Sequence, residues 1–122
     1  METTKELLGI AHLKIYSGRL EEFKRLQAEC IESVRTKDTG TLQYDWYFSN
    51  EFEECLVVER YRDSKALLEH FANLGDTMAA LFKCCSGSGE ICGVPSPELM
   101  KALEGSPVRI YSPYQSMRVD RR

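Results

Sequence analysis

The chain has 122 residues, 43% hydrophobic and 29% charged, which are the proportions of one globular domain that can bury a core. Its formal net charge of −3 supplies no basic field for phosphate backbones, so we expect neither nucleic acid nor a membrane as a partner. No apolar run approaches the ~18 residues of a membrane span, and residues 1–6 lack the layout of a signal peptide, which together predict a cytoplasmic protein.

The first part of the chain predicts a strand followed by a helix. Residues 9–16 alternate apolar Ala11, Leu13 and Ile15 with polar neighbours, which is the period of a half-buried strand. From residue 19 to about residue 36, apolar side chains recur at three- and four-residue steps with charges between them, as in an amphipathic helix. Residues 38–40, Asp-Thr-Gly, then end the helix.

The next segment predicts a β-hairpin. Residues 41–49 alternate, and their apolar members would share one aromatic face; these are Leu42, Tyr44, Trp46 and Phe48. Residues 50–54 are a polar turn, and residues 55–61 are rich enough in β-branched and aromatic side chains to be the third strand.

A second helix follows, with Asp63 or Ser64 as its N-cap. Its inward stripe would be Ala66, Leu67, His70, Phe71 and Leu74. Gly75 and Asp76 interrupt the stripe before a short continuation through Met78, Leu81 and Phe82, and we expect this break to form one wall of a pocket.

The last third of the chain predicts shorter elements. Residues 86–89, Ser-Gly-Ser-Gly, suggest a flexible link, and residues 90–94 a short fourth strand. Ser96 and Pro97 open a short helix that Gly105 ends, and residues 108–114 look extended.

This order of elements predicts an α+β fold of the ferredoxin-like type, βαββαβ, with both long helices on one face of an antiparallel sheet. The opposite face would expose apolar Tyr16, Leu56 and Val58 unless a second copy covers it, so we expect a homodimer. His12 alternates out of the core and is placed at that dimer contact.

The five cysteines have no C-x-x-C spacing and predict reduced, mostly packed thiols; Cys84 and Cys85 would be reactive only beside a cation. The two histidines are far in sequence from every cysteine, and no G-x-G-x-x-G follows a strand. We therefore expect no metal, flavin or nicotinamide cofactor.

Residues 10 to about 85 resemble the antibiotic biosynthesis monooxygenase family of dimeric α+β barrels. The resemblance is carried by Gly18, by residues 38–40 where the family usually has Glu-Pro-Gly, by Tyr44, and by the run 58–63 followed by Glu69-His70. Thr39 in place of proline and Tyr61 in place of tryptophan depart from the family pattern. We accordingly take residues 1–95 as the ferredoxin-like domain and residues 96–122 as a C-terminal extension of the same domain, with a short helix and an extended segment.

The resemblance implies a cofactor-independent monooxygenase that acts with O₂ on a hydroquinone or polycyclic phenol. A haem-degrading role is disfavoured because Ala11 and Ala80 stand near the positions where that branch has its asparagine and its iron-binding histidine. A non-catalytic ligand-binding or dimerisation module and a proton-transfer isomerase remain as alternatives, since a fold does not fix a function.

The candidate site is built around His70 as general base, because neutral imidazole is suited to deprotonating a phenol. Tyr61 and Trp46 would position the substrate ring. Tyr44, Phe71, Met78, Phe82 and Glu59 would line its pocket. Each of these side chains could equally be ordinary core, and Glu59, if it faces inward, must be paired or have a raised pKa.

Overall fold

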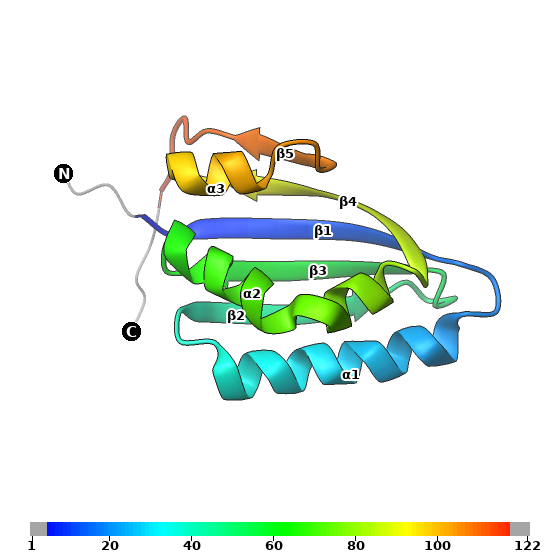
Figure 1. Ribbon diagram of the computed structural model, residues 1–122. Coiled ribbons are helices and arrows are strands. Elements are labelled where there is room, and N and C mark those ends of the chain that lie inside the picture. The colour runs from blue at the N-terminus through cyan, green and yellow to red at the C-terminus, as the bar shows by residue number, and fades with distance from the viewer. Residues whose placement is uncertain (1–4, 118–122) are drawn as a thin grey trace, which may run out of the picture.

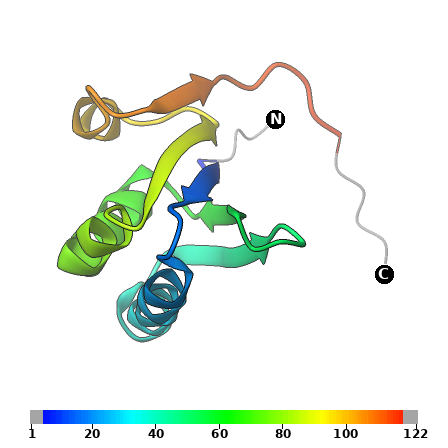
Figure 2. The same cartoon turned by 90° about the vertical axis from the view of Figure 1, so that its right-hand side faces the viewer.

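The computed structural model describes residues 5–117, and the charged C-terminal residues 118–122 lie outside the described part. Its elements in chain order are β1 (Leu7–Ile15), α1 (Leu20–Lys37), β2 (Thr41–Phe48), β3 (Glu54–Tyr61), α2 (Ser64–Leu81), β4 (Cys85–Cys92), α3 (Pro97–Ala102) and β5 (Val108–Tyr111). The three helices lie on one side of the sheet, with α2 between α1 and α3 (Figure 1). Figure 2 shows the two layers from the end, with the other side of the sheet left bare.

The sheet has five strands in the order β2-β3-β1-β4-β5. Its first four strands pair antiparallel, which confirms the predicted ferredoxin-like α+β fold. The fifth strand, β5, pairs parallel with β4, so the sheet is mixed and not purely antiparallel. Parallel neighbours need a crossover connection, and here α3 provides it.

Most of the predicted inward side chains of the strands face the helices. Leu13, Val57 and Tyr61 are buried there, with exposed fractions of 4%, 2% and 1%. Leu42 is the exception: the pairing of β2 with β3 is irregular between Thr41 and Gln43, and Leu42 is 52% exposed. A bulge inserts one residue and breaks the alternation. The prediction that Leu42 shares the aromatic face of this strand was therefore wrong.

β4 also differs from the sequence prediction, because it begins at Cys85 and includes the supposed link 86–89. The predicted fourth strand, residues 90–94, covers only the end of β4. Glycines carry no side chain to show a strand period, which is why the first half of the strand was not recognised. Gly87 has a packing reason: a Cβ there would lie 2.9 Å from Cδ2 of Leu13 and 3.1 Å from the ring of Phe82.

The predicted break in α2 is present at Gly75, whose φ of 43° and ψ of −119° are not helical. Asp63 is the N-cap, and its side chain accepts a hydrogen bond from the backbone N–H of Ala66. After the kink, Met78 and Phe82 lie beside the same space as His70.

The bare side of the sheet exposes Tyr47 and Leu56, which are 54% and 37% exposed. His12 lies on the same side and contacts Glu90, with 2.8 Å between Nε2 and Oε1. The five cysteines are all free thiols, four of them buried, as predicted. Burial raises the pKa of Cys85 to about 11, which disfavours its thiolate. No helix within residues 5–117 is long and apolar enough to cross a membrane.

Candidate active site

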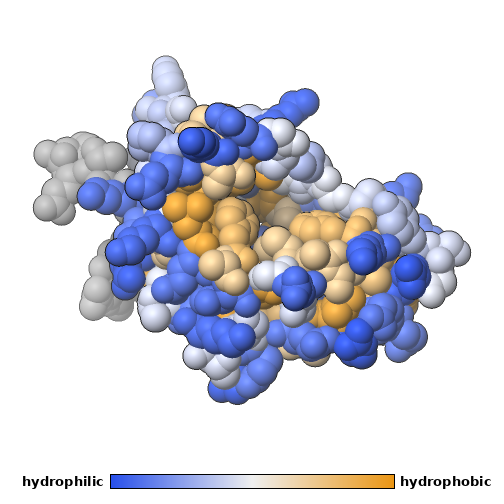
Figure 3. Space-filling view, viewed as in Figure 1, coloured by the Kyte–Doolittle hydropathy of each residue, from blue (hydrophilic) through white to orange (hydrophobic). Residues whose placement is uncertain are grey.

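A cavity of about 460 Å³ lies between the helices and the sheet. In the space-filling view, apolar side chains surround a hollow between α3 and α2 (Figure 3). The structure places all eight of the sequence-predicted site residues in its lining: Tyr44, Trp46, Glu59, Tyr61, His70, Phe71, Met78 and Phe82. The break in α2 contributes to its wall through the flanking Leu74 and Met78.

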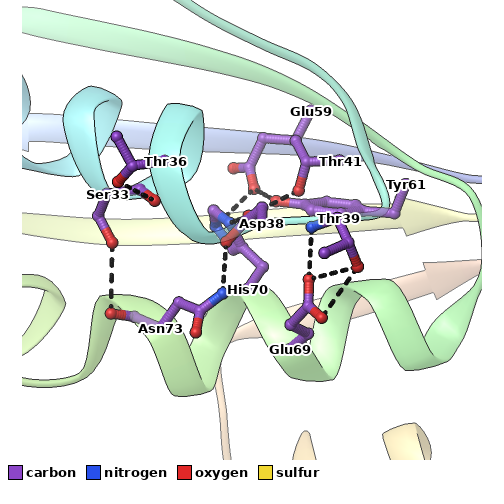
Figure 4. A network of polar contacts seen from close by, with 10 residues as sticks. All are labelled: Ser33, Thr36, Asp38, Thr39, Thr41, Glu59, Tyr61, Glu69, His70 and Asn73. Carbon is purple, nitrogen blue, oxygen red and sulfur yellow. Dashed lines mark hydrogen bonds and ion pairs between the residues drawn. The ribbon is translucent and has the colours of Figure 1, made fainter.

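His70 is 1% exposed and lies between the end of α1 and the sheet (Figure 4). Its Nδ1 is 2.9 Å from a carboxylate oxygen of Asp38, whose side chain is also 1% exposed. Because an ionised carboxylate only accepts hydrogen bonds, Nδ1 carries the proton in this pair. The lone pair of the neutral ring is then on Nε2, which is the atom nearer to Glu59.

Asp38 receives three hydrogen bonds from side chains. Thr41 Oγ1 donates at 2.7 Å, Asn73 Nδ2 at 2.8 Å, and His70 Nδ1 makes the third. Burial alone would raise the pKa of Asp38, but these hydrogen bonds and the nearby imidazole hold its pKa below the usual range. Asp38 therefore remains a carboxylate and fixes both the tautomer and the orientation of His70.

Glu59 faces the other side of the imidazole. Its Oε1 lies 3.7 Å from Nε2 of His70 and accepts a hydrogen bond from the hydroxyl of Tyr61. Burial raises the pKa of Glu59, against the opposing effects of Tyr61 and His70. The site thus contains two carboxyl groups whose pKa values are displaced in opposite directions around one imidazole, an arrangement suited to moving protons.

Aromatic rings enclose the imidazole. The rings of Tyr44 and Tyr61 both lie 5.1 Å from that of His70, and Trp46 lies 5.4 Å from Tyr44, all between centroids. Burial also raises the pKa values of Tyr44 and Tyr61, so both phenols stay protonated. Nε1 of Trp46 is buried and has no hydrogen-bond partner among the described residues.

The loop 38–40 is clamped to α2 by a second contact. Glu69, next to His70, accepts hydrogen bonds from the backbone N–H and the hydroxyl of Thr39, at 2.7 Å and 3.1 Å. Ser33 of α1 donates to the backbone carbonyl of Asn73 at 3.3 Å. These contacts hold α1, the loop and α2 together on one side of the cavity.

Sequence reasoning did not identify Asp38 as a site residue: it treated residues 38–40 as the end of α1 and as part of the family resemblance. Its partner His70 is 32 residues away, so local spacing could not have joined them. Asn73 could have been found, because it lies three residues after His70 and therefore near it on the helix surface. Within residues 5–117, no group of three His, Cys, Asp or Glu side chains could hold a metal ion.

The comparison with curated proteins gives no match. MupZ from Pseudomonas fluorescens has a similar fold, with a TM-score of 0.79 at 21% identity over 98% of this chain and 93% of that one. SnoaB from Streptomyces nogalater, described as a cofactor-independent oxygenase, gives a TM-score of 0.63 at 13% identity, over 71% of this chain and 90% of its own. A putative antibiotic biosynthesis monooxygenase from Caulobacter crescentus gives a TM-score of 0.63 at 23% identity, over 72% of this chain and 86% of that one.

These likenesses show a shared fold. The match to the family model decides the membership, because the model described as antibiotic biosynthesis monooxygenase covers residues 8–80, more than half of the chain. The chain therefore belongs to the antibiotic biosynthesis monooxygenase family.

Proposed function

We propose that this protein is a cofactor-independent monooxygenase acting on a hydroquinone or polycyclic phenol. The observation that carries the proposal is the buried Asp38–His70 pair, which presents an imidazole to an apolar cavity lined by aromatic rings. Membership of the family and the printed description of SnoaB support the reaction class.

In the proposed reaction, Nε2 of His70 takes the hydroxyl proton of the substrate. The resulting phenolate passes one electron to O₂, and the two radicals combine at a ring carbon. Loss of water completes the step, so that a hydroquinone and O₂ give a hydroxylated quinone and one water. Asp38 stabilises the imidazolium formed in the first step, because its charge lies against the protonated Nδ1.

Tyr61 and Trp46 have a positioning role in this proposal. Both line the cavity, and Tyr61 lies against the imidazole that would receive the proton. A flat substrate would stack against these rings in offset or edge-to-face geometry. The low polarity of the surroundings strengthens the electrostatic effect of Asp38 on the reacting atoms.

The second candidate is a proton-transfer isomerase, favoured by the position of Glu59. Burial raises the pKa of its carboxyl group, which favours the protonated form close to His70. His70 could remove a proton from a carbon beside a carbonyl while Glu59 delivers one to another atom of the same substrate. Transfer between the two side chains over 3.7 Å would reset the site. A third alternative is a non-catalytic ligand-binding or dimerisation module that uses the cavity, or the bare side of the sheet, without chemistry.

The proposal includes a homodimer located in the cytoplasm. The exposed Tyr47 and Leu56 lie on the bare side of the sheet, where a second copy would cover them. His12 would then lie at the contact between the two sheets. Nothing in the proposed reaction requires a residue from the second copy.

An oxygen electrode with a panel of reduced quinones and anthrones tests the proposal. We expect uptake of one O₂ per substrate by the wild-type protein, and a fall of about 10²- to 10⁴-fold in His70→Ala, as for loss of a general base. No uptake, with exchange of substrate hydrogen in D₂O, would favour the isomerase. Ligand binding without any reaction would favour the non-catalytic binding module.

A further inference from the structure

The C-terminal part of the chain supplies one wall of the cavity. This C-terminal wall consists of Ala102, Leu103, Ser106, Pro107 and Val108. It lies on the side of α2 opposite to α1, so the cavity extends from the Asp38 side of the helix to the extension (Figure 1).

The C-terminal wall is held firmly in the fold. The backbone N–H of Ser96 donates to the hydroxyl of Ser64 at 2.9 Å, which joins the start of α3 to the start of α2. Leu99 is 0% exposed, and it packs in one cluster with Tyr61, Leu67 and Ile91. β5 pairs with β4 along its length. The wall is therefore a built part of the cavity.

This wall lies outside the part of the chain that matches the family model, which ends at residue 80. The similarities to SnoaB and to the Caulobacter protein cover 71% and 72% of this chain, whereas that to MupZ covers 98%. The cavity thus combines the family's shared region with a wall that the family model does not contain. Such a wall is suited to selecting the substrate.

The charge of the lining restricts what can bind. No lysine or arginine is among the residues that line the cavity, whereas Glu59 is. Glu90 also borders the cavity, but its carboxylate contacts His12 on the bare side of the sheet. A carboxylate or phosphate ligand would lose its hydration without gaining a lysine or arginine partner and would lie near the carboxyl group of Glu59, which is unfavourable. An uncharged ligand avoids this cost.

The size of the cavity restricts the ligand as well. A cavity of about 150 Å³ is sufficient for benzene, and this one has about three times that volume. A single phenol ring at His70 would leave the remaining apolar lining in contact with water. A longer apolar body would bury it.

We infer that the C-terminal wall selects an uncharged substrate with a long apolar body, held with its hydroxyl group at His70 and its body between α2 and the extension. The inference rests on the proposed function for the role of His70. It names the substrate class of that site and assigns specificity to Leu103 and Val108.

Binding of 4-alkylphenols, from phenol to 4-octylphenol below micellar concentrations, tests the inference. Trp46 is the single tryptophan of the chain and lines the cavity, so its fluorescence reports occupancy. We expect affinity to rise about fourfold for each added methylene until the cavity is filled. We expect 4-octylbenzoate, the anionic probe of the same length, to bind at least about tenfold more weakly than 4-octylphenol.

Two variants assign the effect to the C-terminal wall. Leu103→Ala removes apolar contacts and Val108→Phe fills space in the cavity. Each should therefore lower the affinity for 4-octylphenol about tenfold, while the affinity for phenol stays within about twofold of wild type. Met100→Ala is the matched control, because Met100 lies in α3, whose C-cap is Leu103, is 45% exposed and does not line the cavity. It should change neither affinity. Circular dichroism and urea unfolding of each variant identify a general loss of structure.

Three outcomes would overturn the inference: affinity independent of chain length, equal binding of the anionic probe, or equal weakening of phenol and 4-octylphenol by Leu103→Ala. Since the readout is binding, it separates from the proposed function. Chain-length selection without O₂ uptake would refute only the monooxygenase. O₂ uptake without chain-length selection would refute only the C-terminal wall as a selecting element.

Discussion

Asp38 is buried beside His70 and stays ionised because three neighbouring side chains hydrogen-bond its oxygens. Such a carboxylate costs solvation free energy, which these hydrogen bonds offset. It does not line the cavity, so it acts on the reaction only through the imidazole. This division between a residue that touches the substrate and one that positions it gives a kinetic test.

Asp38→Asn should lower kcat by about ten- to a thousandfold and leave KM for the phenol within about twofold. The reason is that a neutral amide no longer stabilises the imidazolium formed when the proton is taken, while the cavity wall is unchanged. The asparagine also meets donors on every side, so we expect a loss of about 1–3 kcal/mol in the free energy of unfolding. Steady-state kinetics over pH and urea unfolding measure both effects.

Glu69→Gln is the control for this prediction. It weakens the contact of α2 with Thr39 and leaves the Asp38–His70 hydrogen bond in place. If loosening the loop were the cause of a low kcat, Glu69→Gln would reproduce it. A rise in KM in both Asp38→Asn and Glu69→Gln would likewise assign Asp38 a purely structural role.

Glu59 should make the stability of the protein depend on pH. Its pKa is raised in the folded state, so the folded protein binds its proton more tightly than the unfolded chain does. The stability that the protonated form contributes is complete below the unfolded pKa of about 4.3 and is lost as pH rises through the folded pKa. Glu59→Gln has no such loss.

The free energy of unfolding of Glu59→Gln should therefore increase relative to wild type from about pH 4.3 upward, with a slope of at most about 1.4 kcal/mol per pH unit. Urea unfolding at intervals between pH 4 and 8 measures the difference. Glu54→Gln removes a carboxylate from the exposed start of the same strand and is the control. A difference that stayed constant with pH would mean that Glu59 has the same pKa in both states.

At the scale of the elements, periodicity predicted β1, α1, β3 and most of β2, because each buries one face and exposes the other. For β4 it predicted a strand only from residue 90 and missed the first half, where glycines replace the side chains that would alternate. It also could not show that β5 pairs parallel with β4, since strand order is decided by packing between distant segments. The role of the extension in the cavity was missed for the same reason.

The site divides in the same way. His70 was identified because it continues the apolar stripe of a helix, and Glu59 because it alternates with Tyr61. The tertiary fold alone brings Asp38 against the imidazole of His70 and Leu103 into the cavity wall. A sequence can therefore indicate which face of an element points inward, whereas the partner across the cavity requires the structure.

The kink of α2 predicts the sign of the stability change when Gly75 is replaced by alanine. Gly75 has a φ of 43°, and no atom lies within 4 Å of the position that a Cβ would take, so conformation alone opposes a larger residue. Gly75→Ala should lower the free energy of unfolding by about 1–3 kcal/mol, because alanine does not adopt this backbone without strain. In a regular helix the same change would stabilise by about 1 kcal/mol. Urea unfolding distinguishes the two, and a stabilised variant would mean that α2 is continuous at Gly75.

For the whole molecule, the two sides of the sheet differ. One side is covered by three helices and holds the cavity, whereas the other exposes apolar side chains of neighbouring strands. Leu56 of β3 pairs with Tyr47 of β2 and with His12 of β1, so these side chains form one surface. Exposed apolar surface of this kind is the usual mark of an interface.

Leu56→Glu should convert a wild-type dimer to a monomer in light scattering after size exclusion. In a two-fold dimer the change occurs twice and places carboxylates in an apolar contact, where an unpaired charge costs about 3–5 kcal/mol. That cost raises the dissociation constant by about two to four orders of magnitude. Met100→Glu, an exposed apolar position on the helical side, should remain a dimer.

The wild-type unfolding midpoint should also rise with protein concentration, because association stabilises only the folded chain. A wild-type protein that is monomeric at every concentration would mean that something other than a second copy covers the bare side of the sheet.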